Sequence, residues 1–256
     1  MRVADMTWPE YRDLIASCIV VLPVGSIDGH GPHLPLSTDT LVSSYLAERL
    51  EEHLDALVLP AIPYGLRTDP AASGGEFAGV TNLRAATFTN VVVDVLRASY
   101  RHGARRFLLL DSHKANLGAL REAVDLFIDR APGAQVMAVT WWDVVSEDSR
   151  SAIAAETGVS RQDDHHAATV ETSLVMHAAP HLVRHDLIAD DAMVRRARYL
   201  ILPVPEDLKT KTGVVYRATA ASPSIGERLM YEIVTNLIAA VRLELGTPAE
   251  KAVQSC

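Results

Sequence analysis

The stretch "CIVVLPVGSIDGHGPHLPLSTDT", residues 18–40, joins a run of apolar residues to a loop that is rich in glycine, proline and acidic or imidazole side chains. Residues 18–25 are almost entirely apolar, which is typical of a strand that is covered on both faces. The loop that follows carries Asp28, His30, His33 and Asp39. In open α/β sheets, ligands bind beyond the carboxyl ends of the strands. The sequence therefore predicts a functional site directly after this strand.

Outward from this stretch, strand-like and helix-like segments alternate along the chain. Strands are expected at 18–25, 56–65, 105–113 and 134–142, and helices at 39–54, 84–103, 116–133, 166–180 and 224–245. Such alternation favours parallel strands joined by crossover helices. We predict an α/β fold, a three-layer sandwich with a mainly parallel central sheet flanked by helices. We find no linker, so residues 1–256 are predicted to form a single domain.

Residues 184–223 carry charges and prolines without a clear period. We expect a short hairpin or a loop near the site in this region.

The composition restricts the class of protein. The apolar fraction is 48%, the charged fraction is 22% and the net charge is −8, which argues against nucleic acid as a partner. No apolar run reaches the ~18–20 residues of a membrane span, and the amino-terminal segment does not resemble a signal peptide. Cys18 and Cys256 are the only cysteines, so a disulfide framework is not supported and a cytoplasmic location is expected. A small molecule is the expected partner.

Two further segments place similar side chains after a strand or before a helix. The segment "LLLDSHKAN", 108–116, runs from a predicted strand into Asp111, Ser112, His113, Lys114 and Asn116. The segment "DDHHAATVETS", 163–173, carries Asp163, Asp164, His165, His166 and Glu171. Carboxylate oxygens and imidazole nitrogens together suit Zn²⁺, Mn²⁺ or Fe²⁺. Asp28 and His30, two residues apart, point to the same side of an extended chain. The three segments together predict a metal site.

Structural roles are alternatives for several of these residues. Thr38 or Asp39 could be the N-cap of the following helix, because aspartate and threonine are favoured there. His33 fits a structural role better than a ligand role. Asp111 could only hydrogen-bond a turn, and the tandem acidic and histidine residues could form a solvated loop. Trp141 and Trp142 fit the core or a pocket wall.

Taken together, the motifs resemble those of the creatininase (creatinine amidohydrolase) family. "PVGSIDGHGPHLPLSTD" is similar to the family pattern "PVGSxEQHGPHLPLxTD", and "HAATVETSLVM" is similar to "HAGExETS". "GEFAGVTNLRAATF" resembles "FPGTxSL", and "LLLDSHKANLGAL" stands where many members read "VNGHGGN". The late segment "TGVVYRATAASPSIGERLM" resembles "GVxGDPxxASxExG". The resemblance covers most of the chain in the same order.

This resemblance implies a compact α/β sandwich, assembled as a hexamer, with two divalent metal ions that hydrolyse C–N amide bonds. Asp39 would bridge the ions, and His166 would carry a proton near the substrate, with Glu171 beside it in the catalytic set. The implied cofactors are two Zn²⁺, Mn²⁺ or Fe²⁺ ions per chain. The metal ligands that the resemblance implies are Asp28, His30, Asp39, His113 and Glu171.

The departures from the family pattern indicate a substrate other than creatinine. Asp28 replaces a glutamate, and Lys114 and Ala115 replace two glycines after His113. We predict a metal-dependent amidohydrolase that cleaves a non-peptide or cyclic amide C–N bond of a small molecule through a metal-activated hydroxide. The predicted substrate-binding residues are Lys114, His165, Trp142 and Glu76.

Other reactions remain open at this stage. The same site could belong to a deformylase or to a small-peptide peptidase of a cofactor or secondary-metabolite pathway. A lyase-type relative or a non-catalytic relative that binds a ligand is a further alternative.

Overall fold

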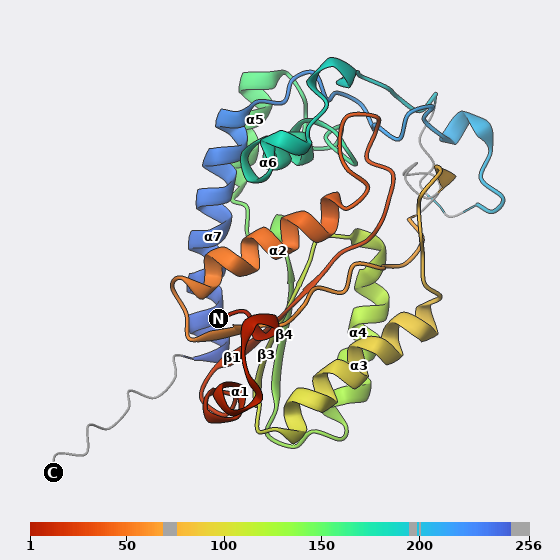
Figure 1. Ribbon diagram of the computed structural model, residues 1–256. Helices are drawn as coiled ribbons and strands as arrows, with labels where there is room; N and C mark the ends of the chain where they lie inside the picture. Colours follow the sequence, from red (N-terminus) through yellow and green to blue (C-terminus); the bar gives the residue numbers. More distant parts are fainter. Residues whose placement is uncertain (69–75, 195–198, 200, 247–256) are drawn as a thin grey trace, which may run out of the picture.

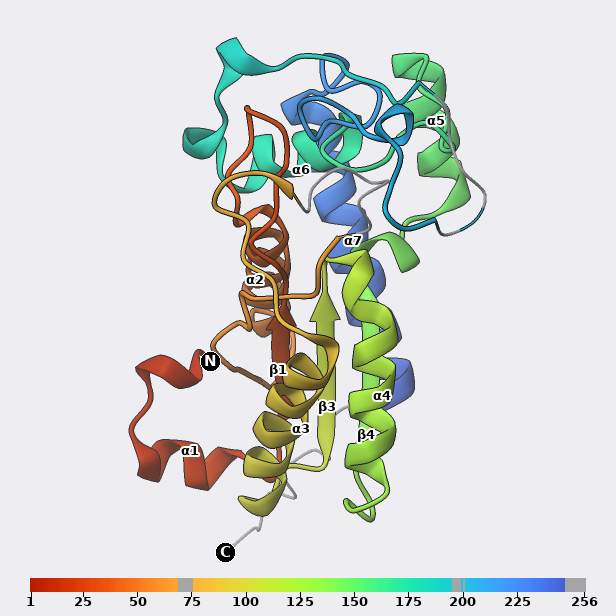
Figure 2. The same cartoon turned by 90° about the vertical axis from the view of Figure 1, so that its right-hand side faces the viewer.

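The centre of the molecule is a parallel sheet, seen in a computed structural model that describes residues 1–68, 76–194, 199 and 201–246. Its strands follow the order β2-β1-β3-β4. Figure 2 shows β1 and β3 side by side with their carboxyl ends at the same edge of the sheet. The prediction of an α/β fold with a mainly parallel sheet is confirmed. The strands are β1 (Ile19–Val24), β2 (Ala56–Val58), β3 (Arg106–Asp111) and β4 (Gln135–Thr140).

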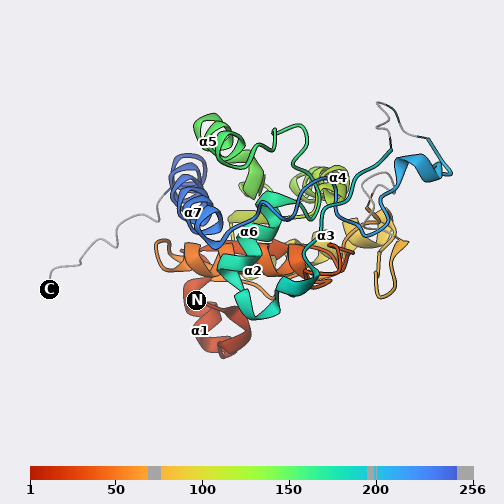
Figure 3. The ribbon, with the colours of Figure 1, turned by 90° about the horizontal axis from the view of Figure 1, so that it is seen from above.

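Helices cover both faces of the sheet, as Figures 1 and 3 show. In β1, Val21 packs into the core formed with α2, α6 and α7, whereas Val20 packs into the core formed with α3 and α4. Each fully buried side chain of this size contributes roughly 1.5–3 kcal/mol, so the alternating side chains hold a helix layer on each face. The covering helices are α2 (Thr38–Glu51), α6 (Thr169–Ala178) and α7 (Pro223–Leu245) on one face and α3 (Ala85–Arg101) and α4 (Leu117–Ile128) on the other.

Most predicted elements are shorter in the structure, and two of them have a clear local reason. The strand predicted at 56–65 ends at Val58, because Pro60 and Pro63 have no N–H to donate to a ladder. Beyond β2, Ile62 forms only an isolated bridge to Val24. The helix predicted at 166–180 begins at Thr169, because Ala167 has a φ of 53°, which no α-helix accommodates.

Two helices were not predicted, although both have local signals. The helix α1 (Trp8–Leu14) begins with a capping box of Thr7 and Glu10. The helix α5 (Glu147–Thr157) has Ser146 as N-cap and ends at Gly158 in the left-handed conformation. Both are short, and their apolar periodicity is weak.

The region 184–223 forms a loop that two consecutive aspartates fasten, with residues 195–198 and 200 outside the described part. Asp190 accepts hydrogen bonds from the backbone of Ala218 and Thr219. Asp191 accepts them from the backbone of Lys211 and Thr212, and its own backbone pairs with Tyr216 in an antiparallel bridge. In the described part, the hairpin alternative is reduced to this single bridge.

Cys18 is buried with a free thiol, and Cys256 lies outside the described residues. Within the described part of the chain, none of the helices combines the length and apolar character that a membrane crossing requires.

Candidate active site

The loops that follow β1 and β3 leave the sheet at a reversal of strand order. From β1 the chain crosses to β2 on one side, whereas β3 leads on to β4 on the other side. Loops that leave neighbouring strands in opposite directions open a binding crevice. Gly25, directly after β1, is essential to its shape, because a Cβ there would lie 2.4 Å from the backbone nitrogen of Thr40. The first turn of α2 therefore packs directly against the end of β1.

This close packing places Asp39 at the centre of the site. Its Oδ1 lies 3.2 Å from Nε2 of His30, and its Oδ2 lies 2.8 Å from Nδ1 of His113. The hydroxyl of Ser26 donates a hydrogen bond of 2.6 Å to Oδ2. The N-cap of α2 is Ser37, so the predicted N-cap role of Thr38 or Asp39 is wrong. The Asp39 carboxylate instead faces two different histidines.

The predicted ligands, together with His166, the predicted proton carrier, fall into two groups around this carboxylate. One contains Asp28, Asp39 and His113, and the other contains His30, His166 and Glu171. Within each group, one potential ligand atom per residue lies within 4.8 Å of the others. The His30 and His166 rings are 4.2 Å apart between centroids. Each group could hold one metal ion.

Hydrogen bonds from the surrounding backbone orient the two outer histidines. Nε2 of His113 lies 2.9 Å from the carbonyl oxygen of Leu66, and Nε2 of His166 lies 2.7 Å from that of Gly29. A carbonyl oxygen only accepts, so both Nε2 atoms carry the proton. In the neutral imidazole, the form that binds a metal, this leaves the lone pair on Nδ1, the nitrogen that faces the site.

The carboxylates are oriented in the same way. Asp28 accepts hydrogen bonds from the backbone of Gly29, at 2.9 Å, and from the hydroxyl of Thr68. Glu171 accepts one of 2.6 Å from the backbone N–H of Ala167, the residue with positive φ. Asp39 and Glu171 both lie in the first turn of a helix, where the partial positive charge of the amino end stabilises an anion.

The buried carboxylates stabilise the protonated forms of His30 and His113. Burial alone would lower the pKa of His30, but Asp39, Glu171 and Asp28 outweigh it and raise that pKa to about 10. For His113, burial is likewise outweighed, chiefly by Asp39, and the pKa rises to about 9. Burial would raise the pKa of Asp39, but the two histidines hold it well below its usual range. Divalent cations would supply the same positive charge.

His166 differs from the other two histidines. Burial, and then the neighbouring His30, lower the pKa of His166 below the ordinary histidine value. Its imidazole is therefore neutral at pH 7, with Nδ1 3.9 Å from the carboxylate of Glu171. A neutral imidazole can accept a proton and pass it on.

The donor set fits divalent cations. Nε2 of His30 is fully buried and makes no well-aligned hydrogen bond within the described residues, although Oδ1 of Asp39 lies 3.2 Å and Glu171 4.0 Å from it. A buried nitrogen without a hydrogen bond is costly unless another partner satisfies it. Imidazole nitrogen and carboxylate oxygen in this number match the coordination chemistry of Zn²⁺, Mn²⁺ and Fe²⁺.

Of the other predicted residues, two are exposed beside site histidines. Lys114 directly follows His113 and begins a short 3₁₀ turn, Lys114–Asn116. His165 is exposed and directly precedes His166.

The remaining two predicted substrate-binding residues contact other groups. Trp142 packs edge-on against Trp141, with ring centroids 5.2 Å apart, at the carboxyl end of β4. The carboxylate of Glu76 pairs with Arg67 at 2.7 Å and with Lys209 at 3.1 Å. Neither residue belongs to the two ligand groups.

His33 and Asp111 have structural contacts. Nε2 of His33 lies 2.8 Å from the hydroxyl of Thr172 in α6, which ties the loop after β1 to that helix. Asp111 accepts hydrogen bonds from the backbone of His113 and from the side chain of Asn116, and burial raises its pKa to about 7. It orders the turn that carries His113, as the structural alternative predicts.

Sequence reasoning missed Ser26 and Thr68, and it named Asn116 without predicting its contacts. Ser26 lies within the first motif and could have been found there. Asn116 links the turn to Gly25 and Leu66 through its side-chain amide, and it stands in the second motif. Thr68, which holds Asp28, lies in a segment without any recognisable local signal.

The comparison with a family model shows the family to which the chain belongs. A model described as creatinine amidohydrolase matches residues 4–241. The chain belongs to the creatininase family. The creatinine amidohydrolase of Pseudomonas putida is 32% identical over 94% of this chain and 96% of its own length. The resemblance of the sequence motifs to this family is thereby confirmed.

Solved creatininase structures have the same architecture. One described as "Creatininase Mn" has a TM-score of 0.88 and 31% identity, covering 95% of this chain and 98% of its own. A mutant creatininase described as "Zn-Zn type" has a TM-score of 0.88 and 30% identity, covering 95% and 97%. A mycofactocin precursor peptide peptidase of Mycobacterium tuberculosis is 29% identical over 86% of this chain and 82% of its own length. The chain is therefore a metal-binding hydrolase of a family whose members act on amide bonds.

Proposed function

We propose that this chain hydrolyses a C–N amide bond of a small molecule other than creatinine, with two divalent cations per chain. The supporting observation is the position of Asp39, whose two carboxylate oxygens face His30 and His113 separately. A carboxylate with two oppositely directed oxygens suits a bridge between two cations. Asp28 and His113 would hold one cation with Asp39, and His30 and Glu171 would hold the other.

The residues divide the chemistry between them. When bound, divalent cations activate water as a nucleophile and polarise the amide carbonyl. His166 is neutral and has Nδ1 free, so it can take the proton from the attacking water and deliver it to the departing nitrogen. That delivery is needed because an amine anion is a very poor leaving group. The hydrogen bond from His166 to Gly29 keeps the imidazole in the tautomer that this requires.

The role of His166 is tested by separating turnover from metal content. His166→Ala should lower kcat by about 10²–10⁴-fold, the usual contribution of a general acid or base, while elemental analysis still finds the cations. A variant that loses a cation as well would make His166 a ligand and overturn its role as proton carrier.

The charge and position of Lys114 favour a substrate that carries a negative charge. It is exposed beside His113, at a position where many family members have glycine. We expect Lys114→Ala to raise KM about tenfold or more for an amide that carries a carboxylate or phosphate, in line with one lost charged contact. In Lys114→Ala, KM for the matched neutral amide should stay at the wild-type value. The control variant Arg121→Ala, which alters an exposed arginine of α4, should have wild-type kinetics on both substrates. Equal effects of Lys114→Ala on both substrates would contradict the role. His165, Trp142 and Glu76 are proposed to line the same pocket more remotely.

A peptide substrate is the second candidate, since a relative of this chain is described as a peptidase. Assays of amine release from lactams, N-formyl compounds and small peptides, with creatinine as the reference, separate the two candidates. Turnover of peptides alone would exclude the proposed class. We further propose that the chain forms homo-oligomers, up to the hexamer that family resemblance implies; a cytoplasmic location remains a prediction.

A further inference from the structure

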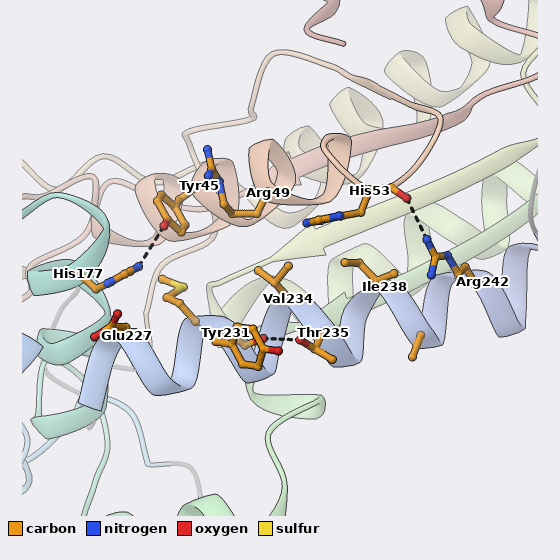
Figure 4. A pocket seen from close by; sticks show the side chains of 12 residues that line it. Tyr45, Arg49, His53, His177, Glu227, Tyr231, Val234, Thr235, Ile238 and Arg242 are labelled. Atoms are coloured by element: carbon orange, nitrogen blue, oxygen red, sulfur yellow. Dashed lines mark hydrogen bonds between the residues drawn. The ribbon is translucent and has the colours of Figure 1, made fainter. Parts of the chain in front are cut away.

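A groove lies between α2 and α7, on a part of the molecule that the proposed chemistry does not use. It has a volume of about 670 Å³ and is shown in Figure 4. Its floor is apolar, with Met230, Val234 and Ile238 from α7, and its sides carry Tyr45 and Arg49 from α2. Figure 4 shows that the side chains of α7 and α2 face each other across it.

One stripe of α7 borders this groove; its two charged ends and its tyrosine are exposed, and its two aliphatic residues are half-buried. The α7 stripe consists of Glu227, Tyr231, Val234, Ile238 and Arg242, spaced by three or four residues, so its members follow one another along a single helix face. Tyr231 is 77% exposed, which is unusual for a large aromatic side chain. Helix stripes of this kind are the surfaces through which helices pack against one another.

The stripe is self-complementary in charge. It has an acidic residue, Glu227, near the amino end of α7 and a basic residue, Arg242, near the carboxyl end. The midpoint between these two residues falls between Val234 and Thr235. A two-fold axis through that midpoint would pair two α7 helices antiparallel and set Glu227 opposite the partner's Arg242. The same axis would set Tyr231 opposite the partner's Ile238.

Neither charged end of the stripe has an ion-pair partner in the part of the chain that the structure describes. Glu227 has no ion-pair partner among the residues that the structure describes. Arg242 donates to the carbonyl oxygen of His53 at 3.1 Å, and no carboxylate pairs with it in the described part. Their charges are thus available for a partner.

The separation of the two charges decides between possible occupants. Fifteen residues of helix, the interval from Glu227 to Arg242, span about 22 Å at 1.5 Å per residue. A small amphiphile with a single charged group engages only one end of such a stripe. A second copy of α7 engages both ends at once, and its 23 residues extend over about 34 Å. That length, with the edge of α2, is compatible with the roughly 800 Å² per partner of a stable interface.

We propose that the α7 stripe is an interface between two copies of this chain, related by a two-fold axis near Val234 and Thr235. The contact is isologous, so each chain offers the same surface to the other. Tyr231 of each chain enters the groove of its partner. The inference rests on the proposed assembly into oligomers but not on the proposed hydrolysis.

Charge reversal on the full-length protein tests the interface. Molar mass would be measured over a range of concentrations by light scattering and sedimentation for the wild type, Glu227→Arg, Arg242→Glu and the double variant. Each single reversal should raise the dissociation constant at least tenfold and lower the mass at a given concentration. The double variant should restore the wild-type mass, because the opposed charges are exchanged. Arg121→Glu on α4 is the control and should leave the mass unchanged.

The outcomes separate this interface from the assembly itself. An oligomeric wild type whose mass neither single reversal changes would overturn the α7 interface and leave the oligomer intact. A double variant that remains dissociated would overturn the antiparallel pairing. A monomeric wild type would overturn both. Saturable binding of decanoate that Arg242→Glu abolishes, without a change in mass, would make a small anion the occupant and also overturn the inference.

Discussion

At the scale of single residues, the proposed metal site depends on the groups that orient the proposed ligands as much as on those ligands. Asp28 has a shorter side chain than the glutamate of the family pattern, and its position is fixed by Gly29 and Thr68. Thr68 is itself buried, so its hydroxyl has little freedom to choose another partner. Groups of this kind orient the carboxylate and tune the affinity for metal.

Thr68→Val keeps the shape of the side chain and removes the hydroxyl. The affinity for one of the cations should fall by about 10–100-fold, the usual effect of losing such a group, because Asp28 is no longer oriented. Competition with a chromogenic chelator would measure this. Thr68→Ser retains the hydroxyl and should bind like the wild type. Wild-type affinity in Thr68→Val would contradict the role.

At the scale of elements, one close helix contact fixes α6, which carries Glu171. The start of α7 packs against α6 at Gly226, where a Cβ would lie 1.9 Å from the carbonyl oxygen of Ser173. The obstructing atom belongs to the backbone of α6, so a side chain at this position would fit only if α7 shifted relative to α6. The position of Glu171 therefore depends on a glycine in a different helix.

Gly226→Ala should destabilise the protein by about 1–3 kcal/mol through overpacking, which corresponds to roughly 2–4 °C in Tm per kcal/mol for a chain of this size. Gly118→Ala is the matched control, since nothing lies within 4 Å of a Cβ there. Alanine at that position should be neutral or stabilise α4 by up to about 1 kcal/mol. Thermal unfolding of both variants measures the difference. Equal Tm values for the two variants would show that the helices adjust freely.

Elements whose signals are apolar patterns local in the sequence could be predicted, and elements without such patterns could not. The strand 18–25 is a continuous apolar run and the helix 224–245 has strong periodicity, and both are close to the observed β1 and α7. α5 was missed because its signal lies in its caps rather than in apolar spacing. The positive φ of Ala167 has no local sequence signal, since alanine rarely adopts it.

At the scale of the whole molecule, the fold determines which ligands meet. The motifs identify the residue types and place them at strand ends, but not their pairing across the crevice. That Asp39 faces both His30 and His113 depends on the tight packing of α2 against β1 at Gly25. The contact of Thr68 with Asp28 joins segments forty residues apart and requires the folded chain. The single-domain organisation remains a prediction.

The arrangement of the strands also brings the loops that carry the proposed ligands together. The two apolar faces fix β1 and β3 side by side, so the loops that carry Asp28, His30 and His113 begin at one edge. The two ligand groups then share Asp39 as their common neighbour. The central claim is that this one carboxylate holds two cations together.

The most direct measurement of this claim is the number of metal ions per chain in Asp39→Ala, determined by elemental analysis after metal-replete expression. Asp186→Asn, which alters an exposed aspartate outside the two ligand groups, is the control. We predict two ions per chain in the wild type and the control, and loss of both in Asp39→Ala. Retention of both ions in Asp39→Ala would contradict the account.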